Sequence, residues 1–220
     1  MPHYSPEAQA LEVVGEKWAL LIVRDLLRCP LRFQELLGYV ADITPRMLSR
    51  RLKELEAAGL IEQVATGGHP PVVRYALTAG GRALRPVIRS LCLWTIVHQP
   101  RPPRPGETVF AEQTLQTLAF YRDLDQAAAG RPWTFALDDP EPAVWSIVPG
   151  DDGWELRAGP APEAGLRIAA ARPIWEVIWR GTLTWADALA EGRVSADGDL
   201  AEALRFNRAI ESLLRRLSPA

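Results

Sequence analysis

The chain has 220 residues, of which 48% are hydrophobic and 24% charged, and its formal net charge is −2. This composition is ordinary for a globular protein, and the length suits one large domain or two smaller ones. No apolar run reaches the length of a membrane span, and the N-terminal "MPHYSPEAQ" lacks a secretory pattern, so we expect a cytoplasmic protein without membrane contact. The two cysteines, Cys29 and Cys92, lie far apart, which argues against a disulfide framework or a structural zinc site. We expect no metal and no cofactor.

Charge is distributed unevenly along the chain. Residues 1–105 contain 14 Lys and Arg against 9 Asp and Glu, a net charge of +5, whereas residues 106–220 contain 11 against 18, a net charge of −7. The halves meet at the proline-rich segment "HQPRPPRPGE", which can neither continue a helix nor join the interior of a sheet. We therefore predict two domains, over residues 1–98 and 107–220, joined by a linker at 99–106.

The first half begins with two helical patterns. "EAQALEVVGEKWALLIVRDLLR", Glu7–Arg28, predicts one long and mostly apolar helix. "RFQELLGYV", Arg32–Val40, predicts a short second helix, because its apolar residues recur at helical spacing. The brief turn "ADI" leads to a third helix.

The third helix, "TPRMLSRRLKELEAAGL", carries its own start and stop signals. Thr44 can cap the first turn, Pro45 suits the first helical position, and Gly59 suits the left-handed residue that ends many helices. At about 100° per residue, apolar side chains gather on one stripe and basic side chains on the opposite side. The stripe consists of Leu48, Leu52 and Leu55; the opposite side consists of Arg46, Arg50 and Lys53, flanked by Ser49 and Arg51.

The segments after this helix complete a recognisable order. Leu60–Val64 and Val72–Leu77 are compatible with strands and are separated by "TGGHPP", which predicts a hairpin. Two helices joined by a tight turn and followed by a hairpin make a winged helix-turn-helix. Ala79–Val97 predicts a closing helix that is too apolar for one small domain to cover, so we expect a dimer interface. Its candidate residues are Leu84, Ile88, Leu91 and Trp94.

Together these segments resemble the HxlR family of bacterial winged-helix transcription regulators, over roughly Ala8 to Val97. The resemblance is carried by "ALEVVGEKWALLIVRDLL", "RFQELL", "ITPRMLSRRLKELEAAGLI" and "YALTAGGRAL". It implies a homodimer that places the Thr44–Ala58 helix in the major groove of a palindromic site on double-stranded DNA. The expected DNA contacts are Thr44, Arg46, Ser49, Arg50 and Lys53 on that helix, with His69 and Arg74 in the wing.

One position departs from many members of this family. They resemble sensors with a cysteine just before the first helix, where this chain has Ser5. Thiol switching at that site is therefore not expected. Cys29 precedes Pro30 at a helix end, where either a reactive thiol or a small packed residue fits, and we favour the packed residue. We interpret Cys92, in an apolar helix, as a core or interface residue.

The second half predicts an α+β domain. A helical pattern over Glu107–Ala129 precedes four short segments, "RPWTFALDD", "AVWSIVPG", "GWELRAG" and "GLRIAAA", in which large apolar residues alternate. This alternation predicts a mostly antiparallel sheet with one apolar face. Two short helices ("PIWEVIWRG" and "TWADALAEG"), a strand ("RVSADGD") and a final helix capped by Asp199 follow.

The segment Ala171–Phe206 resembles the type-two sterol carrier protein fold, through its short helix, "ALAEG" and "GDL". That resemblance covers about the last 90 residues and implies an elongated apolar cavity. Six of the eight tryptophans lie in this half, where they could fill a core or line such a pocket. The candidate ligand-binding residues are Trp133, Phe135, Trp145, Ile147, Trp154, Trp175, Ile178, Trp179 and Phe206.

Three functions compete at this point. The first is a transcription regulator whose second domain senses a small hydrophobic compound. The second is a regulator whose second domain serves only for structure or protein contacts. The third is an enzyme or lipid carrier, but three histidines, no phosphate-binding loop and no nucleophile elbow leave little material for catalysis. We therefore expect no enzymatic activity and no catalytic residues.

Overall fold

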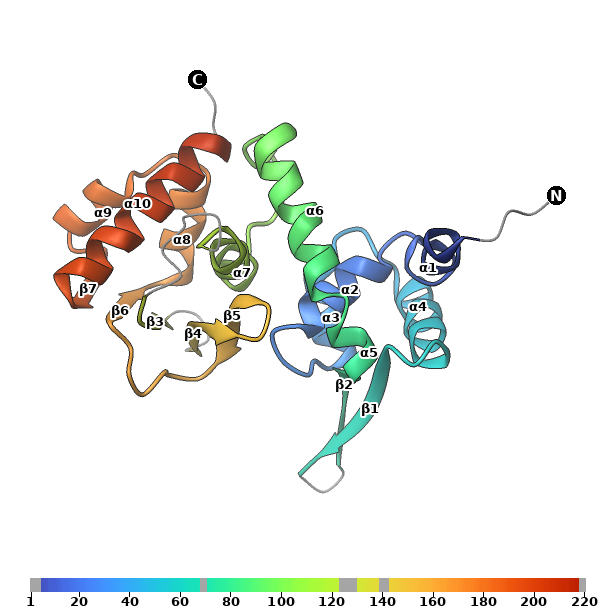
Figure 1. Cartoon of the computed structure of the whole chain (residues 1–220). Helices are drawn as coiled ribbons and strands as arrows, with labels where there is room; N and C mark the ends of the chain where they lie inside the picture. The colour runs from blue at the N-terminus through green and yellow to red at the C-terminus, as the bar shows by residue number, and fades with distance from the viewer. Residues whose placement is uncertain (1–4, 68–70, 123–129, 139–142, 218–220) are drawn as a thin grey trace. The chain divides into compact units, whose positions relative to one another are not determined.

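The computed structural model of the chain describes residues 5–67, 71–122, 130–138 and 143–217. It divides into two compact units, Met1–Ile88 and Arg89–Ala220, so the dividing point lies within helix α6 (Figure 1). None of the helices in the described ranges is long and apolar enough to cross a lipid bilayer.

The first unit is a winged helix-turn-helix, as the sequence predicts. The β1–β2 hairpin is antiparallel, with Ile61 opposite Leu77, and Leu31 pairs with Tyr75 as a single bridge on its outer side. Its elements are α1 (Pro6–Val14), α2 (Ala19–Leu26), α3 (Phe33–Tyr39), α4 (Pro45–Ala57), β1 (Ile61–Thr66), β2 (Val72–Leu77), α5 (Ala79–Arg82) and the start of α6 (Arg85–His98).

The prediction of one long helix over Glu7–Arg28 is wrong, because α1 and α2 are separate. The Gly15 N–H still bonds to Leu11 O, but Trp18 then adopts a left-handed conformation with φ of 74°. Such a conformation is uncommon for a residue with a side chain. Here the Trp18 Nε1–H donates to Ala41 O at 3.1 Å, which ties the α1–α2 turn to the turn before α4. The spacing of apolar residues alone does not reveal that a helix is interrupted in this way.

The prediction of one helix over Ala79–Val97 is also wrong. The structure has a short α5 and a separate α6, and Ala83 and Leu84 lie between them. Pro86 lies in the first turn of α6, where its missing N–H costs nothing, whereas inside a continuous helix it would remove a hydrogen bond. Gly81 packs so closely that a Cβ there would meet Leu60 O at 2.1 Å.

The second unit is built on a five-stranded sheet with the order β5-β4-β3-β6-β7. Only the β3–β6 pair is parallel, so the predicted mostly antiparallel sheet is confirmed. The predicted helix over Glu107–Ala129 is confirmed for its central part, and residues 123–129 lie outside the described residues. The elements are α7 (Ala111–Arg122), β3 (Trp133–Leu137), β4 (Ala143–Gly150), β5 (Gly153–Ala158), β6 (Leu166–Ala170), α8 (Arg172–Trp179), α9 (Trp185–Ala190), β7 (Val194–Gly198) and α10 (Leu200–Leu217).

The proline-rich segment of residues 99–110 forms neither helix nor strand. Within it, the Arg101 guanidinium pairs with the Glu107 carboxylate at 2.7 Å. The hydrogen bonds from Arg101 and from the Arg104 N–H lower the pKa of Glu107 to about 2. The segment therefore has a defined local fold although it lacks regular secondary structure.

The core of the second unit is a cluster of aromatic rings on one face of the sheet. Trp133 and Phe135 project from β3, and Phe206 of α10 contacts both, with ring centroids 5.3 and 6.0 Å away. Trp175 of α8 lies against Phe135 and stacks on Trp185 of α9. These rings join three helices to the central strand.

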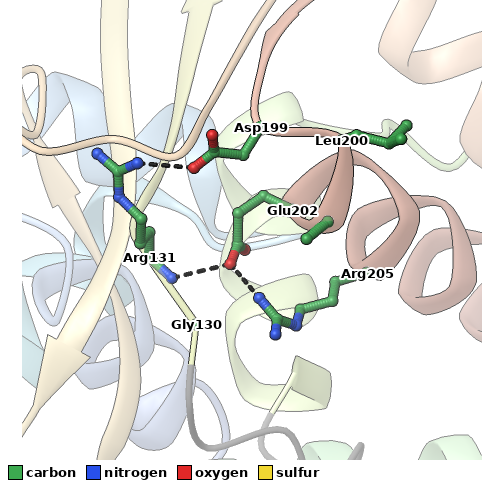
Figure 2. Close-up of a pocket in the computed structure, with 7 residues that line it drawn as sticks. Gly130, Arg131, Asp199, Leu200, Glu202 and Arg205 are labelled. Atoms are coloured by element: carbon green, nitrogen blue, oxygen red, sulfur yellow. Dashed lines mark hydrogen bonds and ion pairs between the residues drawn. The ribbon is translucent and has the colours of Figure 1, made fainter.

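Glu202 is the polar anchor of this core (Figure 2). Its carboxylate is buried, and it accepts hydrogen bonds from Trp133 Nε1 at 2.9 Å and from the Arg131 N–H at 3.1 Å. It also pairs with Arg122 and Arg205. Burial alone would raise the pKa of Glu202, but these hydrogen bonds and positive charges outweigh it and lower the pKa.

We predict that Glu202→Ala destabilises the second unit by about 3 kcal/mol, because it removes a buried carboxylate that pairs with the buried Arg122 guanidinium and accepts a hydrogen bond from Trp133. Since the folded pKa is lowered, the stabilisation from Glu202 should be present above the ordinary Glu pKa and lost as the pH falls through the lowered value. Denaturant unfolding measured between neutral and acidic pH checks both effects. Glu211→Ala, an exposed position on the same helix, is the control and should change little.

Candidate nucleic-acid interface

Helix α4 starts and ends where its sequence signals place it. Thr44 Oγ1 accepts a hydrogen bond from the Met47 N–H at 3.3 Å, and Pro45 occupies the first turn. Gly59 is left-handed, with φ of 68°. Both ends of the helix are therefore fixed by local chemistry, which confirms the predicted bounds.

The two faces of α4 separate as predicted. Leu48, Leu52 and Leu55 are buried, with at most 2% of their surface exposed. The four residues predicted for the opposite side are all exposed: Arg46, Ser49, Arg50 and Lys53. Glu54 and Glu56 of the same helix are exposed as well. An exposed helix face with three cations can contact a polyanion without disturbing the core.

The three cations on this face differ in their partners. Arg50 Nε donates to Glu54 Oε1 at 2.8 Å, whereas Arg46 and Lys53 have no hydrogen-bond or ion-pair partner among the described residues. The hydrogen bond and charge of Glu54 raise the pKa of Arg50, and Arg50 in turn lowers the pKa of Glu54. The sequence does carry a signal for this pair, since Arg50 and Glu54 lie four residues apart, the spacing at which side chains on a helix meet.

Arg51 corrects the prediction that it flanks the basic face. Its side chain is only 6% exposed, and its guanidinium pairs with Glu54 of the same helix and with Glu16 at 2.5 Å. Glu16 belongs to the turn between α1 and α2, so this contact ties α4 to a segment 35 residues earlier. Helical periodicity could not predict the burial, because it depends on a partner outside the helix.

The expected DNA contacts in the wing, Arg74 and His69, differ from the exposed cations of α4. Arg74 is half-buried on β2, and it donates to Pro30 O at 3.0 Å and to Glu35 at 3.2 Å. Its guanidinium therefore holds the hairpin to α3. His69 lies outside the described residues.

Helix α6 exposes an apolar stripe. Leu91 and Trp94 are 50% and 53% exposed, and Val87 and Val97 on the same face are also exposed. The interface candidates predicted from the sequence include Leu91 and Trp94 but neither valine, although Val87 belongs to the apolar set that suggested the interface. Leu84 is half-buried, and Ile88 is buried, so Ile88 belongs to the interior of the chain itself and not to its exposed apolar surface.

Helix α1 contains no buried residue at all, and Leu11 on it is 63% exposed. A helix of nine residues is too short to be stable in water on its propensity alone. Within the single chain, α1 therefore buries little apolar surface.

The nine candidate ligand-binding residues all lie in the second unit and are all buried. None of them lines the pocket in Figure 2, whose walls are Gly130, Arg131, Asp199, Leu200, Ala201, Glu202 and Arg205. A second surface pocket, next to Ser146 and Arg157, does not include them either. Trp145 and Trp175 are notable because their indole N–H groups are buried and have no acceptor among the described residues.

No group of three His, Cys, Asp or Glu in the described part of the chain could hold a metal ion.

Comparison with known proteins places the first unit among DNA-binding regulators. Residues 13–102 match the family described as HxlR-like helix-turn-helix. The chain is 40% identical over 83 residues to the uncharacterized HTH-type transcriptional regulator YkvN of Bacillus subtilis, an alignment that covers 38% of this chain and 70% of YkvN. It is 39% identical over 105 residues to YtcD of the same organism, covering 48% of this chain and 83% of YtcD.

Among solved structures, the reduced form of the transcriptional regulator YodB from B. subtilis is 31% identical, with a TM-score of 0.40. That match covers 48% of this chain and 100% of the YodB chain. The family match ends at residue 102, within the first part of the second unit.

Proposed function

Because this chain belongs to the HxlR-like helix-turn-helix family of transcriptional regulators, we propose that it binds a palindromic operator as a homodimer and senses a small hydrophobic compound through its second unit. The observation that carries the DNA-binding part is the exposed basic face of α4, opposite its buried leucines. A regulator of this kind acts in the cytoplasm and needs no catalytic residue.

In the proposed complex, α4 enters the major groove. Arg50 contacts a base edge, while Arg46 and Lys53 neutralise phosphates and Thr44 and Ser49 contribute shorter polar contacts. This division is supported by the partners of the three cations, since among the described residues Arg50 pairs with Glu54, whereas Arg46 and Lys53 have no such partner. His69 and Arg74 in the wing are secondary contacts, and Arg74 contributes less because it already bonds to Glu35.

The homodimer is supported by the exposed apolar surface. Four large apolar side chains at helical spacing on α6 would be costly to leave in water, and α1 also lacks buried residues. A second copy of the chain would cover both, in an arrangement with two-fold symmetry. Such a dimer would present two copies of α4 to the two halves of a palindromic site.

Ligand sensing is supported by the aromatic core of the second unit and by its resemblance to the type-two sterol carrier protein fold. Trp145 lies opposite Phe135 in the sheet, and the ring of Trp175 contacts Phe135. Their buried N–H groups could donate to a polar group on a mostly apolar compound. An unpaired buried donor costs roughly 1–3 kcal/mol, which a bound acceptor would recover. The second candidate is a unit that serves only for structure or protein contacts, and the close packing of Trp185 on Phe206, at 4.8 Å, favours it.

We predict that Arg50→Ala weakens binding to an operator duplex by roughly thirtyfold or more without unfolding the first unit, because it removes one bidentate base contact, worth about 1–3 kcal/mol, from each of the two half-sites. The duplex is selected from a random library with the unaltered protein, and affinity is measured by gel shift. Arg208→Ala, which removes an exposed arginine from α10, is the matched control and should leave the affinity unchanged. Equal affinities of the Arg50→Ala variant and the unaltered protein would contradict the assignment.

We predict that Leu91→Glu converts the dimer to a monomer and abolishes operator binding, since a charge in an apolar interface is left without a partner. Light scattering at micromolar concentration reports the mass. Leu204→Glu places the same charge at a similarly exposed position on α10 and should leave a dimer. A monomeric unaltered protein would refute the proposed interface.

We predict that a compound from a panel of lipophilic carboxylic acids and phenols changes the tryptophan fluorescence and shifts the operator affinity by roughly 5- to 150-fold, the usual range of allosteric coupling. Trp175→Phe keeps an aromatic ring but removes the indole N–H, so it should weaken the binding of that compound. If the whole panel leaves the fluorescence unchanged, the second unit is better explained as a structural or protein-contact module.

A further inference from the structure

Glu54 occupies an unusual position on α4, because its one carboxylate holds two neighbouring arginines. Its Oε1 accepts from Arg50 Nε at 2.8 Å, and its Oε2 accepts from Arg51. The two arginines point in different directions, since the Arg50 side chain is 66% exposed and the Arg51 side chain is 6% exposed. Glu54 therefore links the exposed face of the helix to a buried cation.

The buried cation makes this link more rigid than a surface ion pair. An exposed pair four residues apart holds its side chains weakly, because both must give up rotamer freedom. Arg51 is different, since burial and the contact with Glu16 at 2.5 Å already restrict it. Arg51 therefore already restrains the Glu54 side chain. When Arg50 bonds to Glu54, only the Arg50 side chain must lose rotamer freedom.

The hydrogen bond between Arg50 and Glu54 determines which nitrogens of the Arg50 guanidinium remain available to bind DNA. Nε lies on one edge of the planar group and is used by Glu54, whereas the two terminal nitrogens lie at its end. An end-on guanidinium is suited to the paired O6 and N7 acceptors of guanine in the major groove. Arg46 and Lys53 have no such restraint among the described residues and can follow any nearby phosphate.

We propose that Glu54 is a positioning residue that holds Arg50 end-on toward a base edge and keeps it from acting as a general phosphate contact. The inference rests on the proposed DNA binding and deepens it by assigning sequence discrimination to a carboxylate that itself repels DNA. The Arg51–Glu16 contact extends this support to the turn between α1 and α2.

The test compares two duplexes of equal length and base composition: one selected from a random library by the unaltered protein, and a scrambled version of it. Glu54→Ala should bind the scrambled duplex more tightly, and the ratio of the two affinities should fall roughly tenfold. The slope of log affinity against log salt for the scrambled duplex should steepen by about two, because Arg50 of each protomer becomes a phosphate contact. Glu54→Gln, which keeps the side-chain shape, should change the ratio in the same direction.

Glu56→Ala is the matched control, because it removes an equal charge from the same helix but its partner is Gln63 and not an arginine. It should raise both affinities together and leave their ratio unchanged. In an Arg50→Ala background, Glu54→Ala should no longer lower the ratio. The proposal is overturned if Glu54→Ala and Glu56→Ala behave alike, or if the loss of discrimination persists without Arg50. If the unaltered protein does not distinguish the two duplexes, the proposed operator binding fails as well, and that result is visible before any variant is made.

Discussion

The burial of three leucines on α4 is the constraint on which the candidate site depends. Fully burying one leucine side chain is worth roughly 1.5–3 kcal/mol, so Leu48, Leu52 and Leu55 together fix how the helix is rotated about its axis. The caps at Thr44 and Gly59 fix where it begins and ends. The direction of its basic face then follows from packing, before any contact with DNA is considered.

Each unit also contains a buried arginine that joins segments far apart in the chain. In the first unit, Arg51 connects α4 to the turn after α1 through Glu16. In the second unit, the Arg122 guanidinium lies 3.7 Å from the ring centre of Trp133 and 3.4 Å from that of Trp154, and it pairs with Glu202. A buried cation requires both a counter-charge and hydrogen-bond acceptors, so these partners must be in place for the surrounding elements to pack.

The sequence predicted the elements whose signals are local and missed the features that depend on distant partners. Capping residues and alternating apolar residues located α4, the hairpin and the strands of the second sheet correctly. The left-handed Trp18 was missed because its indole bonds to Ala41, 23 residues away. The burial of Arg51 and the internal pairing of Arg74 were missed for the same reason, since helical or strand spacing says nothing about Glu16, Glu35 or Pro30. Pro86 is the one local signal that could have divided the predicted last helix of the first unit.

If α4 reads guanines in the major groove, methylation interference on a selected operator duplex should detect the contact. Methylation at guanine N7 blocks the major groove, whereas methylation at adenine N3 blocks the minor groove. We expect interference at guanine N7 in two half-sites centred about 10 base pairs apart, because a dimer has one recognition helix per half-site. Full binding to duplexes methylated at every guanine N7 would contradict it.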